Sequence, residues 1–206
     1  IKTLLIDNYD SYTYNLFHQL AKANGVSPHV VYNDAHGGDL WKVIELMEEP
    51  PHNIVLSPGP GHPGNEADFG MCRQALEEAP DIPLLGVCLG HQGLGRSVGG
   101  HVRRMPEVMH GRFSPVFHNG AGGMFEGVEQ GFKVVRYHSL AVDAASVEEG
   151  CEVTAWTSDG VVMGLKHRER PHWGLQFHPE SIGTQAGDRL IENFRDLTRS
   201  WYEGEQ

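Results

Sequence analysis

The chain has 206 residues, and 27 acidic side chains against 16 lysines and arginines give it a formal charge of −11. This length suits one α/β domain with a sizeable core, so we expect a single domain over residues 1–206. The negative charge repels phosphate backbones and anionic membrane surfaces, which argues against a nucleic-acid-binding protein. No apolar run approaches the length of a membrane span, and we expect no membrane partner.

Three cysteines, Cys72, Cys88 and Cys151, cannot form a fully paired disulfide framework, which suits a reducing compartment. The first residues already resemble a core strand, so no targeting peptide is visible. The chain starts at Ile1 instead of a methionine, as a domain excised from a longer chain or a processed product would. We therefore expect it in the cytoplasm, or in a plastid if it is a processed or excised plant-type domain.

The first part of the chain alternates apolar strands with amphipathic helices. Short apolar runs predict strands, and apolar residues at helical spacing predict helices between them. The predicted strands cover residues 2–6, 29–32, 53–56 and 83–88, and the predicted helices cover residues 14–21 and 40–47. This alternation indicates a mostly parallel central sheet with flanking helices.

Cys88 ends the fourth of these strands and is followed by a helix-compatible segment that runs to about Val98. Gly86 and Gly90 flank it, as a tight strand-to-helix turn requires, because only small neighbours fit beside its strained backbone. The start of a helix favours a thiolate over a thiol. The alternative is a buried cysteine that acts as a small hydrophobic residue.

A second polar group ends a strand near the end of the chain. Residues 175–177 alternate like a strand, and Pro179 stops it directly after His178. A turn at Pro179 would bring the Glu180 carboxylate onto the imidazole and fix its tautomer. Alone, this tripeptide would more often be an exposed turn, but together with Cys88 it predicts the Cys–His–Glu triad of a thiol hydrolase.

The loop after the third strand, residues 57–64, holds three glycines and three prolines, which rigidify it at the carboxyl edge of the sheet. Attack of a thiolate on an amide produces an oxyanion that needs fixed hydrogen-bond donors. We expect the backbone amides of Gly59, or Gly61, and Leu89 to supply them. A phosphate-binding loop is the alternative, but no Gly-Lys-Ser/Thr ending or GxGxxG pattern follows.

After residue 100 the chain becomes rich in short strands. They are predicted around Val102 and over residues 113–116, 133–137, 152–156, 161–166 and 173–177, followed by an amphipathic helix over 186–197. Ser139 and the Leu140 backbone follow one of these strands and are candidates for the site, with a plain strand-to-turn junction as the alternative. Residues 109–114 predict either a partner-contact loop or a polar hairpin.

Four motifs, in order along the chain, carry a resemblance to a known family. They are Ser57-Pro58-Gly59-Pro60-Gly61, Gly86-Val87-Cys88-Leu89-Gly90-His91-Gln92, Tyr137-His138-Ser139-Leu140 and Gln176-Phe177-His178-Pro179-Glu180-Ser181. Over essentially its whole length, the sequence resembles the class I, triad-type glutamine amidotransferases. The resemblance implies their flavodoxin-like α/β fold, with a mostly parallel central sheet, flanking helices and an added β-rich second half.

The resemblance also implies roles for the site residues. Cys88 would be the nucleophile, His178 the general base and acid, and Glu180 the orienting carboxylate. Glutamine would be held by residues from several segments, namely Gly59, Pro60, Gly61, Gln92, Ser139 and Leu140. The resemblance implies no metal or organic cofactor for this half-reaction.

Residues 7–15 and 109–114 resemble the branch of the family that supplies ammonia to chorismate-using synthases. This implies a synthase partner, either a domain of the same chain or a separate subunit, with His110, Gly111 and Ser114 as candidate contacts. Residues 132–140 look more like the glutaminase domain of fused aminodeoxychorismate synthases than like a stand-alone anthranilate synthase component II. The first assignment places the chain in folate supply, and the second places it in tryptophan supply.

Three other classes of protein stay open. A self-contained γ-glutamyl thiol hydrolase would share Cys88 and His178 and would need no partner. A zinc-binding module would use Cys88, His91, His178 and Glu180 as ligands, but structural zinc sites usually bring cysteine pairs, which this sequence lacks. A non-catalytic homologue would be expected to lack the nucleophile.

Overall fold

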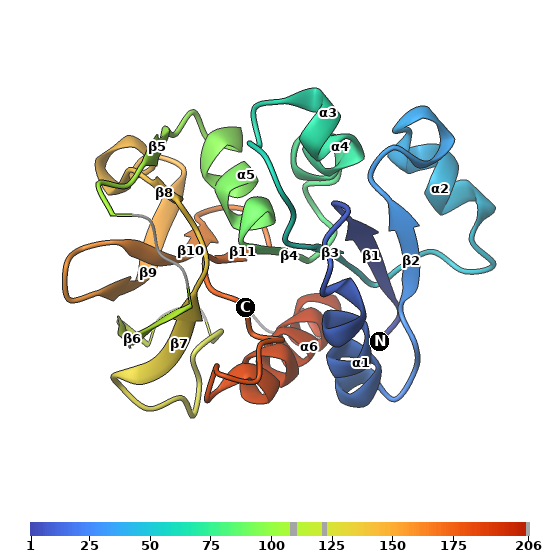
Figure 1. The fold of residues 1–206 in the computed structure, drawn as a ribbon. Helices are drawn as coiled ribbons and strands as arrows, with labels where there is room; N and C mark the ends of the chain where they lie inside the picture. Colours follow the sequence, from blue (N-terminus) through green and yellow to red (C-terminus); the bar gives the residue numbers. More distant parts are fainter. Residues whose placement is uncertain (108–110, 121–122, 205–206) are drawn as a thin grey trace.

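The computed structural model describes residues 1–107, 111–120 and 123–204. The strands are β1 (Thr3–Asp7), β2 (His29–Tyr32), β3 (Asn53–Leu56), β4 (Leu84–Val87), β5 (Val102–Arg104), β6 (Arg112–His118), β7 (Phe132–Arg136), β8 (Leu140–Val142), β9 (Cys151–Thr157), β10 (Val162–His167) and β11 (His172–Leu175). Within these described ranges, nine of them form one sheet in the order β2-β1-β3-β4-β11-β10-β9-β6-β7, and β5 pairs with β8 (Figure 1).

Helices cover both faces of this sheet. They are α1 (Thr13–Asn24), α2 (Leu40–Leu46), α3 (Glu66–Phe69), α4 (Met71–Glu78), α5 (Leu89–Ser97) and α6 (Gly187–Glu203), with short 3₁₀ turns at Ala35–Gly37 and Ala144–Ser146. Figure 1 shows α1 and α6 below the sheet and α2 to α5 above it. The site is therefore built on a sheet that is shielded from water on both sides.

The predicted parallel half of the sheet is confirmed. β2, β1, β3, β4 and β11 all run in the same direction. The two-residue period along β1 explains how it is covered: Leu4 and Ile6 pack with α2, α4 and α5, whereas Leu5 packs with α1 and α6. Parallel strands bring their carboxyl ends to one edge, where the loops that carry polar residues meet.

The predicted β-rich second half is also present, and it continues the same sheet. β10 runs antiparallel to β11, and β9, β6 and β7 follow in antiparallel pairs. β11 is thus the point where the parallel and antiparallel parts join.

The last predicted strand ends earlier than expected. It stops at Leu175, which pairs with Val87 at the end of β4. Since β4 offers no further partner there, Gln176 and Phe177 leave the sheet and the chain turns toward Cys88. The expectation of a strand up to Phe177 was therefore wrong by two residues.

Three further elements, α3, α4 and β8, were not predicted from the sequence. In α4 the buried residues Met71, Cys72, Ala75 and Leu76 recur at helical spacing between two loops. β8 is three residues long and pairs with β5. A strand of that length is too short to display a period of two, so the sequence carried little signal for it.

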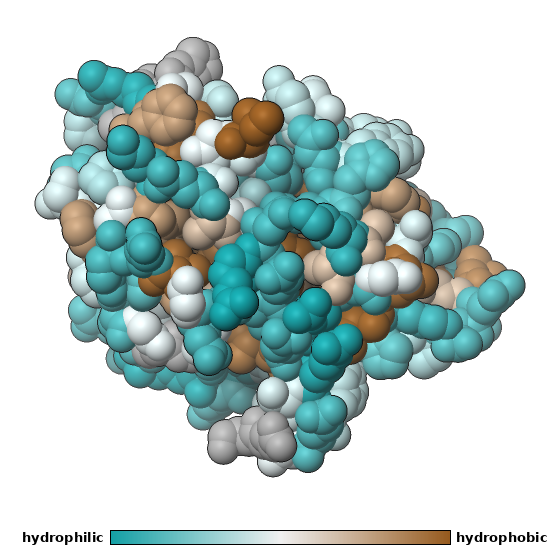
Figure 2. All heavy atoms as spheres, turned by 90° about the horizontal axis from the view of Figure 1, so that it is seen from below, coloured by the Kyte–Doolittle hydropathy of each residue, from teal (hydrophilic) through white to brown (hydrophobic). Residues whose placement is uncertain are grey.

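The lower face of the molecule is closed by α6. Leu190, Ile191 and Phe194 of this helix are buried against the sheet. Figure 2 views the molecule from below and shows a mainly hydrophilic surface with scattered apolar side chains. In the part of the chain that the structure describes, no helix is long and apolar enough to cross a bilayer.

Candidate active site

Cys88 occupies the tight turn between β4 and α5 that the sequence predicts. Its φ of 51° and ψ of −98° place a non-glycine residue in a strained region of backbone space. A Cβ added to Gly86 would lie 2.4 Å from the Gly90 carbonyl carbon, and one added to Gly90 would lie 2.7 Å from Leu56 Cβ. Both glycines are needed because strand and helix approach each other this closely.

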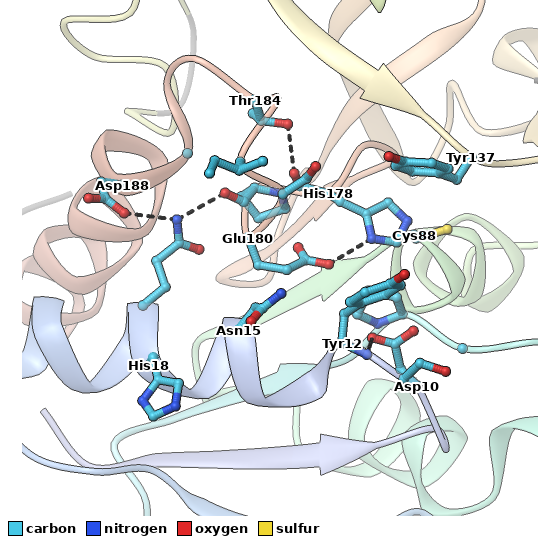
Figure 3. Close-up of a pocket in the computed structure, with 18 of the residues that line it drawn as sticks. Asp10, Tyr12, Asn15, His18, Cys88, Tyr137, His178, Glu180, Thr184 and Asp188 are labelled. Atoms are coloured by element: carbon cyan, nitrogen blue, oxygen red, sulfur yellow. Dashed lines mark hydrogen bonds and ion pairs between the residues drawn. The ribbon is translucent and has the colours of Figure 1, made fainter. Parts of the chain in front are cut away.

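His178 lies beside Cys88, as Figure 3 shows, and its imidazole interacts with the sulfur. The predicted turn at Pro179 brings Glu180 back onto the imidazole, with 2.7 Å between His178 Nδ1 and Glu180 Oε1. Nδ1–H therefore donates to the carboxylate, and Nε2 is left to exchange a proton with the sulfur. Thr184 fixes the backbone by donating its hydroxyl to the His178 carbonyl at 2.7 Å.

The surroundings of the imidazole favour its charged form. Burial acts to lower the pKa of His178, but interactions of the imidazolium as a donor with Cys88 and Glu180, and the negative charges of these two groups, outweigh it and raise this pKa. Burial, and then the negative charge of Glu180, also raise the pKa of Asp10, which lies nearby. Tyr137 packs edge-on against the imidazole, with 5.8 Å between ring centres. This arrangement can hold an imidazolium next to a thiolate.

Cys88 and His178 open onto a cavity of about 1220 Å³. Figure 3 shows this cavity running past Asn15 and Glu180 toward Asp188 at the start of α6. Of the six residues expected to hold glutamine, only Gly59 and Pro60 line this cavity. Such a volume is large enough to admit an amino-acid side chain to the sulfur.

The loop after β3 is held against the loop after β1. A Cβ at Gly59 would lie 2.5 Å from the Asn8 backbone oxygen, so no other residue fits there. Asn8 Nδ2 donates to the Ser57 carbonyl at 2.9 Å, and the Asn8 backbone N–H donates to Ser57 Oγ at 2.8 Å. Because Pro58 and Pro60 have no N–H, Gly59 carries the one backbone donor of this three-residue stretch.

The other two residues expected to supply a backbone donor for the oxyanion, Leu89 and Gly61, differ in their surroundings. Leu89 is the first residue of α5, where a backbone N–H has no partner within the helix, and its side chain is buried in the core. Gly61 instead faces Asp68, whose Oδ2 would lie 2.2 Å from an added Cβ, and it does not line the cavity. The geometry thus favours Gly59 over Gly61.

Gln92 makes contacts that the sequence did not predict. Its Nε2 donates to the Leu140 carbonyl at 3.3 Å and to Gln176 Oε1 at 3.2 Å. Gln176 is fully buried, and its own Nε2 lies 3.6 Å from Cys88 Sγ as a hydrogen-bond donor. Gln176 lies within one of the motifs that carry the resemblance, but the resemblance implies no role for it. Its place two residues before His178 was the available signal.

The segment with Ser139 and Leu140 lies on the same side of the site as Gln92. The Leu140 carbonyl accepts from Gln92 and lies 2.8 Å from His138 Nδ1. Burial lowers the pKa of His138 to about 4, so this imidazole is neutral and donates its Nδ1–H. Ser139 accepts a backbone hydrogen bond from Met105 at 2.9 Å. Leu140 is the first residue of β8, so this segment joins two strands. The alternative of a plain junction between a strand and a turn describes it only in part.

The candidate partner-contact residues are only partly described. His110 lies outside the described residues. Gly111 donates its N–H to the Arg136 carbonyl at 2.9 Å and lies beside Tyr137. Ser114 belongs to β6, and its hydroxyl accepts a hydrogen bond from the buried Arg136 guanidinium at 3.4 Å. Gly111 is therefore near the site, whereas the Ser114 hydroxyl points into the protein toward Arg136.

The alternative zinc site does not form. His91 is fully buried, and a Cβ added at Gly174 would lie 2.7 Å from its Nδ1. Among residues 1–107, 111–120 and 123–204, no group of three histidine, cysteine or acidic side chains is placed to bind a metal ion.

Known proteins are similar to this chain in sequence and in fold. An aminodeoxychorismate synthase of Streptomyces griseus is 54% identical over 96% of this chain, which spans about a quarter (26%) of that protein. An anthranilate synthase component 2 of Methanothermobacter thermautotrophicus is 43% identical over 93% of this chain and 96% of its own length. The fold of a glutamine amidotransferase from Thermotoga maritima covers the whole chain with a TM-score of 0.70 at 19% identity.

The family model of class-I glutamine amidotransferases matches residues 4–197, which include every motif that carries the resemblance. The elbow at Cys88 and the turn that joins His178 to Glu180 lie within this match. The chain therefore belongs to the class I glutamine amidotransferase family.

Proposed function

We propose that this chain is the glutaminase part of an aminodeoxychorismate synthase. It hydrolyses glutamine through Cys88, His178 and Glu180, and the ammonia passes to a chorismate-using synthase that makes 4-amino-4-deoxychorismate. The observation that supports the hydrolysis best is a strained cysteine beside an imidazole that a carboxylate orients at 2.7 Å. The 54% identity with the Streptomyces griseus synthase supports the acceptor.

The reaction begins with acylation of the cysteine. The Cys88 thiolate attacks the carboxamide carbon, and the backbone amides of Gly59 and Leu89 hold the resulting oxyanion. The His178 imidazolium gives its proton to the amide nitrogen as the C–N bond breaks. Ammonia leaves, and a γ-glutamyl thioester remains on Cys88.

The second step releases glutamate. Neutral His178 takes a proton from water, and the water oxygen attacks the thioester carbon. The C–S bond breaks, so Cys88 returns as a thiolate and His178 is again an imidazolium. Glu180 keeps the imidazole in one tautomer through both steps. These steps use no metal or organic cofactor.

Glutamine contacts are proposed on two sides of the sulfur. Gly59 and Pro60 face the cavity. Gln92 and the segment of Ser139 and Leu140 approach Cys88 from the side of α5 and β8. Polar groups from several segments suit the amino and carboxylate ends of the amino acid.

A synthase partner is supported by the surface around the cavity. Tyr9, Tyr12, Tyr137 and Ile182 line its mouth, and each is more than half exposed. Exposed apolar side chains that gather at one opening mark an interaction site more often than scattered ones do. A synthase seated there would receive ammonia before it is protonated in bulk water.

The compartment is proposed on chemical grounds. All three cysteines are free, as a reducing compartment would leave them. We place the chain in the cytoplasm, or in a plastid if it belongs to a plant-type protein.

The second candidate is the glutaminase component of anthranilate synthase. It is favoured by the Methanothermobacter thermautotrophicus relative, which this chain matches over 96% of that protein's length. The two candidates share the hydrolysis and differ in the product of the synthase.

Product identity tests the proposal. The chain is mixed with both kinds of candidate partner, a synthase that forms aminodeoxychorismate and one that forms anthranilate, together with chorismate and glutamine, and the products are analysed by mass spectrometry. We expect aminodeoxychorismate, and with Cys88→Ser we expect it only when ammonia replaces glutamine. Anthranilate as the product would overturn the pathway and keep the hydrolysis. Glutamine use that survives Cys88→Ser would overturn the hydrolysis itself.

A further inference from the structure

Next to Cys88, a short series of hydrogen bonds ends on the sulfur. Gln176 Nε2 lies 3.6 Å from Cys88 Sγ, and Gln176 Oε1 accepts from Gln92 Nε2 at 3.2 Å. Gln92 Nε2 also donates to the Leu140 carbonyl at 3.3 Å. Gln176 is fully buried, and its backbone N–H donates to the Met163 carbonyl of β10 at 3.0 Å, so the side chain starts from a fixed point.

The orientation of both amides follows from the Leu140 carbonyl. A backbone carbonyl can only accept hydrogen bonds, so the group of Gln92 that faces it must be the NH₂ end. The second hydrogen of this NH₂ points to Gln176, which must then present its oxygen. The NH₂ end of Gln176 is left to face the sulfur. His138, which donates Nδ1–H to the same carbonyl, holds the start of the series in place.

We propose that Gln176 is a catalytic residue of the thiol chemistry: its side-chain amide donates a hydrogen bond to the Cys88 sulfur, and Gln92 is the positioning residue that keeps the donor end pointed there. A donor aimed at the sulfur stabilises a thiolate more than a thiol, because the charged acceptor makes the stronger bond. This inference rests on the proposed glutaminase function of the same site.

The same donor acts in both halves of the reaction. Before acylation it raises the share of Cys88 that is a thiolate. When water attacks the thioester, the C–S bond breaks and negative charge returns to the sulfur, where the Gln176 NH₂ group is already in place. Gln176 and His178 thus both approach the sulfur from the segment that follows β11.

The test measures thiolate directly. Wild type, Gln176→Met and Gln176→Glu are alkylated with iodoacetamide from about pH 5 to about pH 10, and the rate at Cys88 is followed by peptide mass spectrometry. Burial raises the pKa of Cys151 to about 12 and raises that of Cys72 still further, so these thiols stay unreactive. Iodoacetamide needs neither glutamine nor a partner, so the result stands apart from the proposed function.

We expect the midpoint of the alkylation profile to move upward by about one pH unit in Gln176→Met. In Gln176→Glu it moves further, because a carboxylate replaces the donor. Gln92→Met should shift it in the same direction by less, and this variant decides the question if Gln176→Met folds poorly. The matched control is Gln130→Met, which loses side-chain bonds to the His118 backbone but touches no sulfur, and its profile should match wild type.

Profiles of folded Gln176→Met and Gln176→Glu that coincide with wild type would overturn the inference and leave Gln176 a packing residue. A shifted profile in a chain that does not hydrolyse glutamine would keep the inference and reject the proposed function. If the chain hydrolyses glutamine but the Gln176 variants show the wild-type alkylation profile, the proposed function is kept and the inference is rejected.

Discussion

Gly59 occupies a position where the backbone of another loop leaves no space for a side chain. A Cβ there would lie 2.5 Å from the Asn8 backbone oxygen and 2.6 Å from its Cβ. Asn8 is itself held by Ser57, and Asn33 Nδ2 donates to its Oδ1 at 2.9 Å. The position of the Gly59 N–H is thus set by a buried polar network that joins the ends of β1, β2 and β3.

Gly59→Ala should therefore displace the oxyanion donor. We expect kcat for glutamine hydrolysis to fall by about 10²–10³-fold, as the loss of one such donor costs in other enzymes, with a smaller change in KM. Gly160→Ala serves as the control, because nothing lies within 4 Å of its added Cβ. That variant should keep its kcat, although it should lose stability because alanine is strained at the Gly160 φ of 82°. A Gly59→Ala enzyme with normal kcat would mean that another group holds the oxyanion.

For single residues, the sequence indicated the three side chains that meet at Cys88 better than the residue that contacts the sulfur from within the core, Gln176. Cys88, His178 and Glu180 stand out because each follows an apolar strand and belongs to a known chemistry. Gln176 carries no such mark, since a glutamine in a strand is usually a solvent-facing residue. Its contact with Cys88 depends on where β11 ends relative to β4, and a one-dimensional pattern does not contain that information.

Among the elements, the turn from β4 into α5 stores strain at Cys88. A non-glycine residue at φ 51° and ψ −98° costs about 1–3 kcal/mol relative to a relaxed backbone. Glycine adopts such angles freely but loses about 0.5–1 kcal/mol through the entropy of the unfolded chain.

Cys88→Gly should consequently be at least as stable as Cys88→Ala. Urea unfolding of the two inactive variants measures the difference. At Arg199, which is exposed inside α6 and carries no such strain, we expect the usual order, with the glycine variant less stable than the alanine variant by about 1 kcal/mol. If alanine is favoured by that margin at position 88 as well, the elbow is not strained.

The strand β8 and the early end of β11, which the sequence did not predict, share a cause. β8 exists because β5 lies beside it, and its three residues show no pattern of their own. β11 stops at Leu175 because its neighbour β4 has reached its end at Val87. Both features depend on partners distant in sequence, whereas α1 and α6 carry their own amphipathic period and a glycine C-cap.

For the molecule as a whole, buried neutral histidines make stability depend on pH. Burial lowers the pKa of His91 to about 3 and those of His138 and His172 to about 4. In the unfolded chain these groups titrate near 6.5. Between these values the unfolded state binds more protons than the folded state, so the free energy of unfolding falls as the pH drops from about 6.5 to about 4. The raised pKa of His178 acts above this window and does not offset the loss.

Each of the three histidines contributes a slope of up to about 1.4 kcal/mol per pH unit. Urea unfolding at several pH values from about 4 to about 7 measures the sum. His172→Gln should lower the slope by about one third, because the amide can still bond the Ala79 carbonyl but does not titrate. A flat profile across this range would show that these side chains are accessible to protons in the folded state.

At the same scale the fold class could be predicted, but the strand order could not. Alternating strands and helices lead to a parallel sheet, and the short strands after residue 100 lead to a β-rich half. That β11 inserts between β4 and β10, and so unites both halves in one sheet, is a long-range pairing that only the folded chain reveals.

The insertion of β11 beside β4 sets the order in which the chain acquires its chemistry during synthesis. The Cys88 backbone N–H is bound to the Leu175 carbonyl at 2.8 Å, and His178 follows three residues later. A ribosome that has made the first four strands has made the nucleophile, yet neither its base nor the strand that holds the elbow exists. The group of Cys88, His178 and Glu180 can therefore assemble only after the last strand, β11, has been made and placed.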